Sequence, residues 1–348
     1  MKPQTPRQAG FSMPAEWAKH SSVWLAWPSH DDLWQETLPA AQEEFVALCQ
    51  LICDIDPQSK KARGETLNVL VPTEEAGARA ESALRGLPAH LHLIPFGDIW
   101  LRDTAPLFLK GPNGPSTVRF GFNGWGGKYV LEHDSDVSAR IAEKSPGPHF
   151  QFPWVLEGGS VELDGEGLCL TTRQCLLNPN RNPSMDQEHI EEGLREGLGA
   201  EKILWLGDGL KNDHTDGHID TIARFVGPSK VLCMKAKDDT DPNFRVMRDI
   251  ERDLRAMTNL RGQPLTVGTV VSPGPIHNDN GDLMPASYLN FYIGNTTVVV
   301  PTYGSPMDQE AVVQIAEWFP GRRTVGSSAF AILSGGGAFH CISQQVPL

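Results

Sequence analysis

Residues 212–221, with the sequence Asn-Asp-His-Thr-Asp-Gly-His-Ile-Asp-Thr, are rich in residue types that can do chemistry. His214 and His218 are four residues apart, and on a helix this spacing would align both imidazoles for a zinc ion. Gly217 is a poor helix former, however, and the β-branched residues after His218 favour a strand. On a strand His218 and Asp220 point to one face, where they form an acid–base pair that can also bind a cation. Both interpretations are open here: this acid–base pair, or a zinc set of His214, His218 and Asp220.

Cys341 follows a run of three glycines, in the sequence Ser-Gly-Gly-Gly-Ala-Phe-His-Cys of residues 334–341. Glycines allow the backbone to turn sharply and to approach another group closely. A cysteine beyond such a turn, at the mouth of a strand over residues 329–346, can present its thiol to a cleft. A buried structural cysteine is the alternative, because free cysteine is among the most buried residue types.

Asp103 lies in an apolar segment, three residues after Trp100. It can pair with Arg102 on the surface of an edge strand over residues 100–110, which would contribute little. Alternatively, it is a carboxylate in a dry pocket, with Trp100 packed over a planar cation. Glu157 precedes two glycines, which would place its carboxylate at the rim of a site or form no more than a turn.

Composition excludes several classes of protein. The 348 residues carry a formal net charge of −13, which argues against nucleic-acid binding. No stretch approaches the roughly 20 apolar residues of a membrane helix, and no secretory signal precedes the first apolar run. None of the six cysteines forms a CxxC pair, so we expect free thiols in the cytoplasm.

The elements that must position these residues are short strands that alternate with single helices. Residues 40–55 place Phe45, Leu48, Cys49 and Ile52 on one helical face, and three further helices are expected over residues 185–197, 242–257 and 308–318. Strands are expected throughout, with hairpin turns at residues 164–167 and 294–296. No linker divides residues 1–348, so we predict a single α/β domain of about five modules. The glycine spacing does not fit a dinucleotide-binding fold.

Taken in order, these segments resemble the agmatine deiminases and related peptidyl-arginine-deiminase-type enzymes. The resemblance covers nearly the whole chain, through residues 13–17, 24–28, 100–106, 122–128, 157–160, 215–220, 285–291 and 335–345. It implies a pentein fold, which is a five-bladed α/β-propeller of ββαβ modules with pseudo-fivefold symmetry.

The resemblance also implies the site residues. Cys341 would be the nucleophile, His218 the general acid and base, and Glu157 its support. Asp103 and Asp220 would bind the guanidinium, Trp100 would line the pocket, and Asn290 is a further candidate.

The activity implied is hydrolysis of agmatine to N-carbamoylputrescine and ammonia through a covalent cysteine intermediate. A thiolate is suited to this because it is a good nucleophile at neutral pH. The alternative substrates are free or peptidyl arginine or another guanidino compound. We expect a small cationic guanidino substrate, no metal or other cofactor, and a homodimer or larger homo-oligomer.

Three positions depart from the pattern of the relatives. Ala105 stands where a glycine is common, and Gly97 stands where an acidic or polar residue is frequent. His214 stands where agmatine-specific relatives tend to have an acidic residue, so a protonated His214 would repel the distal amine of agmatine.

Overall fold

The structure is a computed structural model that describes residues 4–112 and 114–348. The first sheet joins the two ends of the chain. Its strands are, in order, β18 (Gln344–Pro347), β1 (His20–Ala26), β2 (Thr66–Val71) and β3 (Ala89–Leu93). β18 runs antiparallel to β1, whereas β1, β2 and β3 are parallel. The crossovers contain α1 (Asp31–Trp34), η1 (Gln35–Thr37), α2 (Leu38–Cys53) and α3 (Glu74–Ala83).

Four further sheets repeat one pattern, in which an antiparallel hairpin is followed by a helix and a parallel third strand. The second and third sheets contain β4 (Leu107–Gly111), β5 (Gly114–Gly121), α6 (Asp134–Lys144) and β6 (His149–Val155), then β7 (Glu162–Leu163), β8 (Leu168–Thr172), α8 (Gln187–Leu198) and β9 (Lys202–Leu206). The fourth and fifth contain β10 (Ala223–Gly227), β11 (Lys230–Lys235), α9 (Phe244–Ala256) and β12 (Thr266–Val271), then β15 (Tyr292–Ile293), β16 (Thr297–Thr302), α10 (Asp308–Ala316) and β17 (Arg323–Ser328). A short pair, β13 (Ile276–His277) and β14 (Leu283–Met284), precedes the fifth sheet.

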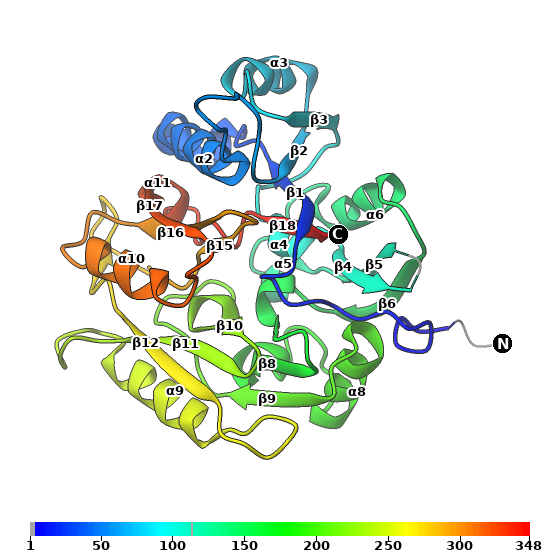
Figure 1. Ribbon diagram of the computed structural model, residues 1–348, viewed down its shortest axis with the longest axis vertical. Coiled ribbons are helices and arrows are strands. Elements are labelled where there is room, and N and C mark those ends of the chain that lie inside the picture. Colours follow the sequence, from blue (N-terminus) through cyan, green and yellow to red (C-terminus); the bar gives the residue numbers. More distant parts are fainter. Residues whose placement is uncertain (1–3, 113) are drawn as a thin grey trace.

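The larger sheets follow one another around the molecule in sequence order, from the blue β1–β3 region to the orange β15–β17 region (Figure 1). The predicted face of the first long helix is confirmed, since Phe45, Leu48, Cys49 and Ile52 of α2 are all fully buried. Such apolar faces cover the sheets and form the core. The expected mixed α/β character and the ββαβ order of elements therefore hold in the described residues.

The helices α3 and α6 were not predicted from the sequence, nor were the short helical turns in the connections. Six of these turns lie outside the first sheet's crossovers. They are α4 (Leu101–Thr104), α5 (Gly124–Gly127), η2 (Gly158–Ser160), α7 (Arg173–Leu176), η3 (Ile219–Thr221) and α11 (Phe330–Leu333). Three strand predictions were wrong in part for this reason: residues 100–106, residues 218–221 and residues 329–343 are not strands. His218 and Asp220 therefore do not share a strand face, because η3 begins directly after His218.

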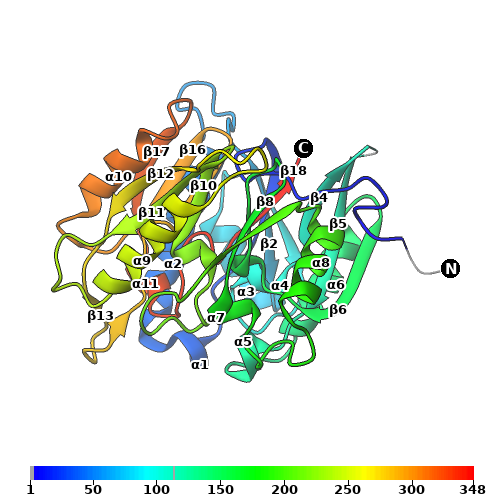
Figure 2. The ribbon, with the colours of Figure 1, turned by 90° about the horizontal axis from the view of Figure 1, so that it is seen from below.

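Seen from below, α1 and α5 lie at one edge of the molecule, opposite the C-terminus (Figure 2). In the described residues, no helix combines the length and the apolar character needed to cross a membrane.

Candidate active site

Each of the five connections that lead into a sheet brings at least one predicted site residue. Asp103 lies on α4 before β4, and Glu157 lies directly before η2 and β7. His218 and Asp220 lie at η3 before β10. Asn290 and Cys341 complete the set, before β15 and β18 respectively. The repeated topology therefore explains how residues far apart in sequence reach one place.

Cys341 lies in a turn between α11 and β18, rather than at the mouth of a long strand. Its Sγ accepts a hydrogen bond from Asn290 Nδ2 at 3.0 Å and donates to Asp220 Oδ2 at 3.4 Å. Asn290 Oδ1 also accepts from the Cys341 backbone N–H at 3.2 Å. Asn290 thus holds both the backbone and the sulfur of Cys341, and Asp220 lies against that sulfur.

The thiol faces a cavity of about 250 Å³. Cys341 is 6% exposed, whereas the other five cysteines are completely inaccessible. The cavity is lined by aromatic side chains together with Asp98, Asp103 and the glycine run; the aromatic residues are Trp34, Trp100, Trp125, Tyr129 and His214. A cavity of this kind, apolar with a few convergent polar groups, is typical of a small-molecule site.

The glycine run is needed because side chains approach it closely. A Cβ on Gly337 would lie 2.7 Å from the ring of Trp100 and 3.1 Å from the Sγ of Cys341. A Cβ on Gly335 would lie 2.8 Å from Trp100 and 2.9 Å from Trp34. The glycines therefore allow the indole rings and the thiol to meet at the floor of the cavity.

Gly159 marks the point where the polar groups converge. A Cβ on this residue would lie 2.6 Å from His218 Nδ1, and 3.1 Å from both Asp103 Oδ1 and Asp220 Oδ2. Asp103 is fixed here by the backbone N–H of Gly159 at 2.9 Å and by Trp125 Nε1 at 2.8 Å. The structure therefore brings Cys341, His218, Asp103, Asp220 and Asn290 together around one small space.

Several buried polar atoms at this point have no hydrogen-bond partner within the described part of the chain. They are both ring nitrogens of His218 and Oδ1 of Asp220. His218 and Asp220 are completely buried. Buried polar groups in folded proteins are nearly always paired, so a cluster of exceptions near the Cys341 thiol marks a candidate ligand site.

The electrostatics around Cys341 disfavour a thiolate. Burial raises the pKa of the Cys341 thiol well above its ordinary value, and the negative charges of Asp220 and Asp103 raise it further. Burial alone would raise the pKa of Asp220 as well, but the hydrogen bond and charge of His340 hold it below its ordinary value. The site therefore favours the neutral thiol of Cys341 and the charged form of Asp220, and a bound cation would change that balance.

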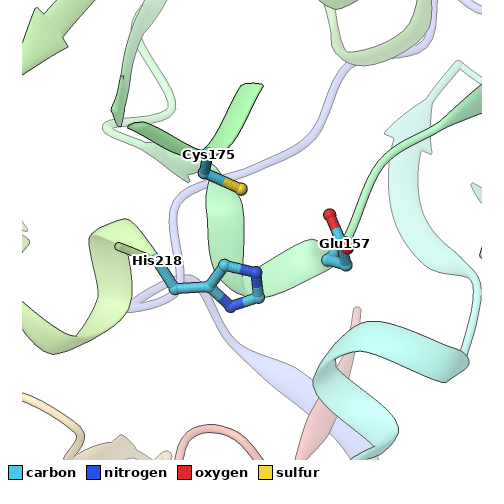
Figure 3. Close-up of side chains that lie close together, drawn as sticks. All are labelled: Glu157, Cys175 and His218. Atoms are coloured by element: carbon cyan, nitrogen blue, oxygen red, sulfur yellow. The ribbon is translucent and has the colours of Figure 1, made fainter. Parts of the chain in front are cut away.

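Glu157 lies next to His218 but does not line the cavity. Both of its carboxylate oxygens accept from Arg181 Nε, at 3.0 and 3.2 Å. Glu157, Cys175 and His218 point toward one another (Figure 3), and each offers one ligand-type atom within 4.8 Å of the others. These three residue types can hold a divalent metal ion, although Arg181 occupies the carboxylate.

The proposed zinc set of His214, His218 and Asp220 is not assembled. Among the described residues, the groups of close metal-ligand types are Glu157 with Cys175 and His218, and Glu16 with Glu162 and His340. His214 instead lies at the mouth of the cavity, where its ring stacks on Tyr129 with 5.6 Å between centroids.

The surface pair of Arg102 and Asp103 is also wrong, because Arg102 is buried and bonds elsewhere. It donates to Glu16 Oε1 at 3.1 Å, to Gln344 at 3.0 Å and to Gln345 at 2.7 Å. Sequence reasoning missed this buried cluster and also Trp34, whose indole lies 6.2 Å from that of Trp100. Such contacts join residues far apart in sequence and leave no local pattern.

Asp98 fixes the two tryptophans. Its carboxylate accepts from Trp34 Nε1 at 3.0 Å and from Trp100 Nε1 at 2.8 Å. Close packing explains why its neighbour Gly97 has no side chain, since a Cβ there would lie 2.4 Å from the side chain of Leu131. Ala105, with φ −81° and ψ 164°, has an ordinary extended conformation that does not require glycine.

Comparison with known proteins shows which family this chain belongs to. Among curated relatives, agmatine deiminase of Stutzerimonas stutzeri is 37% identical over 367 residues, which cover 99% of this chain and 97% of that protein. Agmatine deiminase of Ectopseudomonas mendocina is 36% identical over 369 residues, which cover 99% and 97%.

Among solved structures, agmatine deiminase of Enterococcus faecalis superposes with a TM-score of 0.90 at 32% identity, over 100% of this chain and 98% of that chain. DDAH from Pseudomonas aeruginosa, complexed with citrulline, superposes with a TM-score of 0.52 at 12% identity, over 94% of this chain and 99% of that chain, which bears on the fold alone. The model of the Porphyromonas-type peptidyl-arginine deiminase family matches residues 12–347. With that match and these relatives over nearly its whole length, the chain belongs to the Porphyromonas-type peptidyl-arginine deiminase family.

Proposed function

We propose that this protein is an agmatine iminohydrolase, which converts agmatine and water to N-carbamoylputrescine and ammonia. The observation that carries the proposal is the convergence of Cys341, Asp220, Asp103 and His218 around Gly159, next to an aromatic cavity that Asp103 and Cys341 line. The relatives named agmatine deiminase support the choice of agmatine over other guanidino compounds.

The substrate guanidinium would bind between the two carboxylates. Its N–H groups can donate to Asp220 Oδ1, which has no partner among the described residues, and to the remaining lone pairs of Asp103. Such charge-assisted hydrogen bonds are stronger than neutral ones and would orient the planar group over the sulfur. Trp100 and Trp125 line the same cavity and would pack against the cation.

Binding of the cation would also activate the nucleophile. Besides burial, the charges of Asp220 and Asp103 raise the pKa of Cys341. A guanidinium between them offsets those charges, so the thiol loses its proton more readily when the substrate is present. His218 accepts this proton in the proposed mechanism.

The Cys341 thiolate then attacks the guanidinium carbon and forms a C–S bond. His218 returns its proton to one amino group, and ammonia leaves as the C–N bond breaks. The product of this half-reaction is an amidino-thioether on Cys341. His218 next deprotonates a water molecule that adds to the same carbon, and the C–S bond breaks to release the ureido product. Glu157 supports His218 from behind, with its own charge offset by Arg181.

Arginine and other guanidino compounds are the alternative substrates. The position of His214 is the observation that supports arginine. It lies at the cavity mouth, with its Nδ1 3.3 Å from the hydroxyl of Tyr129. A protonated imidazole here would favour a distal carboxylate over a distal amine.

The finer description of the fold is part of the same proposal. We infer that the five ββαβ sheets are the blades of a pentein propeller with pseudo-fivefold symmetry, formed by residues 1–348 as one domain. The six free cysteines fit a cytoplasmic protein, and a homodimer or larger assembly is the expected oligomeric state.

The test compares ammonia release from agmatine and from arginine, together with mass spectrometry of enzyme quenched during turnover. We expect agmatine to be the faster substrate and an amidino adduct on the peptide that contains Cys341. The Cys341→Ala variant should form no adduct and release no ammonia. Faster turnover of arginine would contradict the substrate, and an active Cys341→Ala variant would contradict the mechanism.

A further inference from the structure

His340 lies directly before the proposed nucleophile, and its side chain is completely buried. Its ring bridges two acids, with Nδ1 2.7 Å from Asp220 Oδ2 and Nε2 2.7 Å from Glu16 Oε1. Neither the sequence nor the proposed mechanism assigns a role to this residue. The contact with Asp220 connects it to the site, because the same Oδ2 lies 3.4 Å from the Cys341 sulfur.

Both acids that contact His340 act as hydrogen-bond acceptors. Glu16 also accepts from Arg102 Nη1 at 3.1 Å and from Arg224 Nη2 at 2.6 Å, so its carboxylate is surrounded by donors. Asp220 accepts from the thiol of Cys341. An ionised carboxylate can only accept, so each nitrogen of the His340 ring must carry a proton to make these short contacts.

We propose that His340 is a positioning residue that carries a proton on both ring nitrogens, anchors Asp220 through Oδ2 and leaves Oδ1 for the substrate guanidinium. This inference rests on the proposed function for the identity of the substrate group. It adds a role that acts through Asp220, since His340 itself does not line the cavity.

The surroundings explain how a charged imidazole can be buried here. The ionisable groups around it are Asp220, Glu16, Arg102, Arg224, Glu162 and Cys341; Arg102 also donates to the His340 carbonyl at 3.3 Å, and Arg224 donates to Glu162 at 3.0 Å. Three carboxylates and two guanidinium groups therefore enclose one imidazolium. Without His340, Asp220 Oδ2 would lose its strongest donor and the carboxylate would be free to rotate away from the substrate.

Two conservative variants test the two ring nitrogens of His340 separately. An asparagine amide can occupy the place of Nδ1, so His340→Asn keeps a donor to Asp220 and loses the contact with Glu16. A glutamine amide reaches the place of Nε2, so His340→Gln keeps the contact with Glu16 and loses the donor to Asp220. We expect His340→Gln to lower kcat/KM about 100-fold, with a raised KM, and His340→Asn to lower it no more than about 10-fold. Equal losses in both variants would overturn the proposal, because a purely structural role would not distinguish them.

A second measurement requires no substrate. In protein labelled with ¹⁵N-histidine, the His340 ring signals are assigned by their loss in His340→Gln. We expect a proton on both ring nitrogens in the folded protein, because each nitrogen lies 2.7 Å from a carboxylate oxygen. A ring with a proton on one nitrogen alone would overturn the proposal. Failure of the proposed function is recognised separately, since an active Cys341→Ala variant would leave this spectroscopic result unaffected.

Discussion

The surroundings of Cys341 favour its neutral thiol. Its side chain is buried, and burial together with the charges of Asp220 and Asp103 raises the pKa of the thiol well above its ordinary value. In the proposed mechanism the thiolate forms when a guanidinium offsets these charges, which would protect the thiol from adventitious electrophiles. The proposal thereby couples substrate binding to activation of the nucleophile at the level of single residues.

This coupling predicts opposite changes in reactivity and catalysis for Asp103→Asn. Removing the negative charge lowers the pKa of Cys341, so we expect alkylation by iodoacetamide at about pH 8 to become several-fold faster. Loss of a guanidinium contact should at the same time lower kcat/KM about 100-fold. Mass spectrometry of the peptide that contains Cys341 measures the first effect. The exposed Asp32→Asn variant is the control, and slower alkylation of Asp103→Asn would contradict the coupling.

His214 predicts a change in substrate preference at the cavity mouth. We compare His214→Glu with His214→Gln, because the two side chains have nearly the same size and differ in charge. The carboxylate should attract the distal ammonium of agmatine, so we expect kcat/KM for agmatine to be about 5-fold higher in the Glu variant at low salt. The ratio should decrease as salt is added. If the two variants turn over agmatine equally, the distal end of the substrate does not lie near His214.

At the scale of elements, short helical turns position the candidate site residues, and the long helices and the sheets support these turns. α4, η2 and η3 are three or four residues long, yet they carry Asp103, Gly159 and Asp220. Each turn precedes the first strand of a sheet. The hairpins and crossover helices then fix where each turn begins, so the rigid sheets determine the relative positions of the catalytic groups.

Gly159 on η2 gives a test of this arrangement. A methyl group there would lie 2.6 Å from His218 Nδ1 and 3.1 Å from two carboxylate oxygens. We expect Gly159→Ala to lower kcat more than 100-fold, since displacement by about 1 Å is enough for such a loss. Gly321→Ala is the matched control, because nothing lies within 4 Å of its added Cβ. Near-normal turnover by Gly159→Ala would mean that the catalytic groups do not converge at this point.

These elements also show what the sequence can and cannot predict. The helices α2, α8, α9 and α10 repeat apolar residues over several turns, and they were predicted within a few residues of their observed bounds. The turns α4, η3 and α11 are too short for any periodicity, so adjacent strand-like residues led to wrong strand predictions there. The candidate site residues were named by type and by resemblance, whereas Arg181 and His340, which contact Glu157 and Asp220, were not.

At the scale of the whole molecule, one buried cluster of charges connects distant parts of the chain. Glu16 comes from the segment before β1, Arg102 from α4, Arg224 from β10, and His340 from the turn before β18. Glu16 accepts from all three of these residues. The cluster therefore joins the segment before β1 to α4, to β10 and to the turn before β18.

Glu16→Gln tests whether this cluster stabilises the fold. Although burial alone would raise it, the charges of Arg102, His340 and Arg224 hold the pKa of Glu16 well below its ordinary value. Its contribution to stability is therefore present above the ordinary carboxyl pKa and is lost as the pH falls through the lowered value. We expect the variant to lose about 3 kcal/mol near pH 7, because breaking a buried ion pair leaves unmatched charges. The difference in Tm from the unmodified protein should shrink below about pH 4. The exposed Glu36→Gln variant should show neither effect, and a difference that stays constant with pH would mean that Glu16 is not ionised in the folded protein.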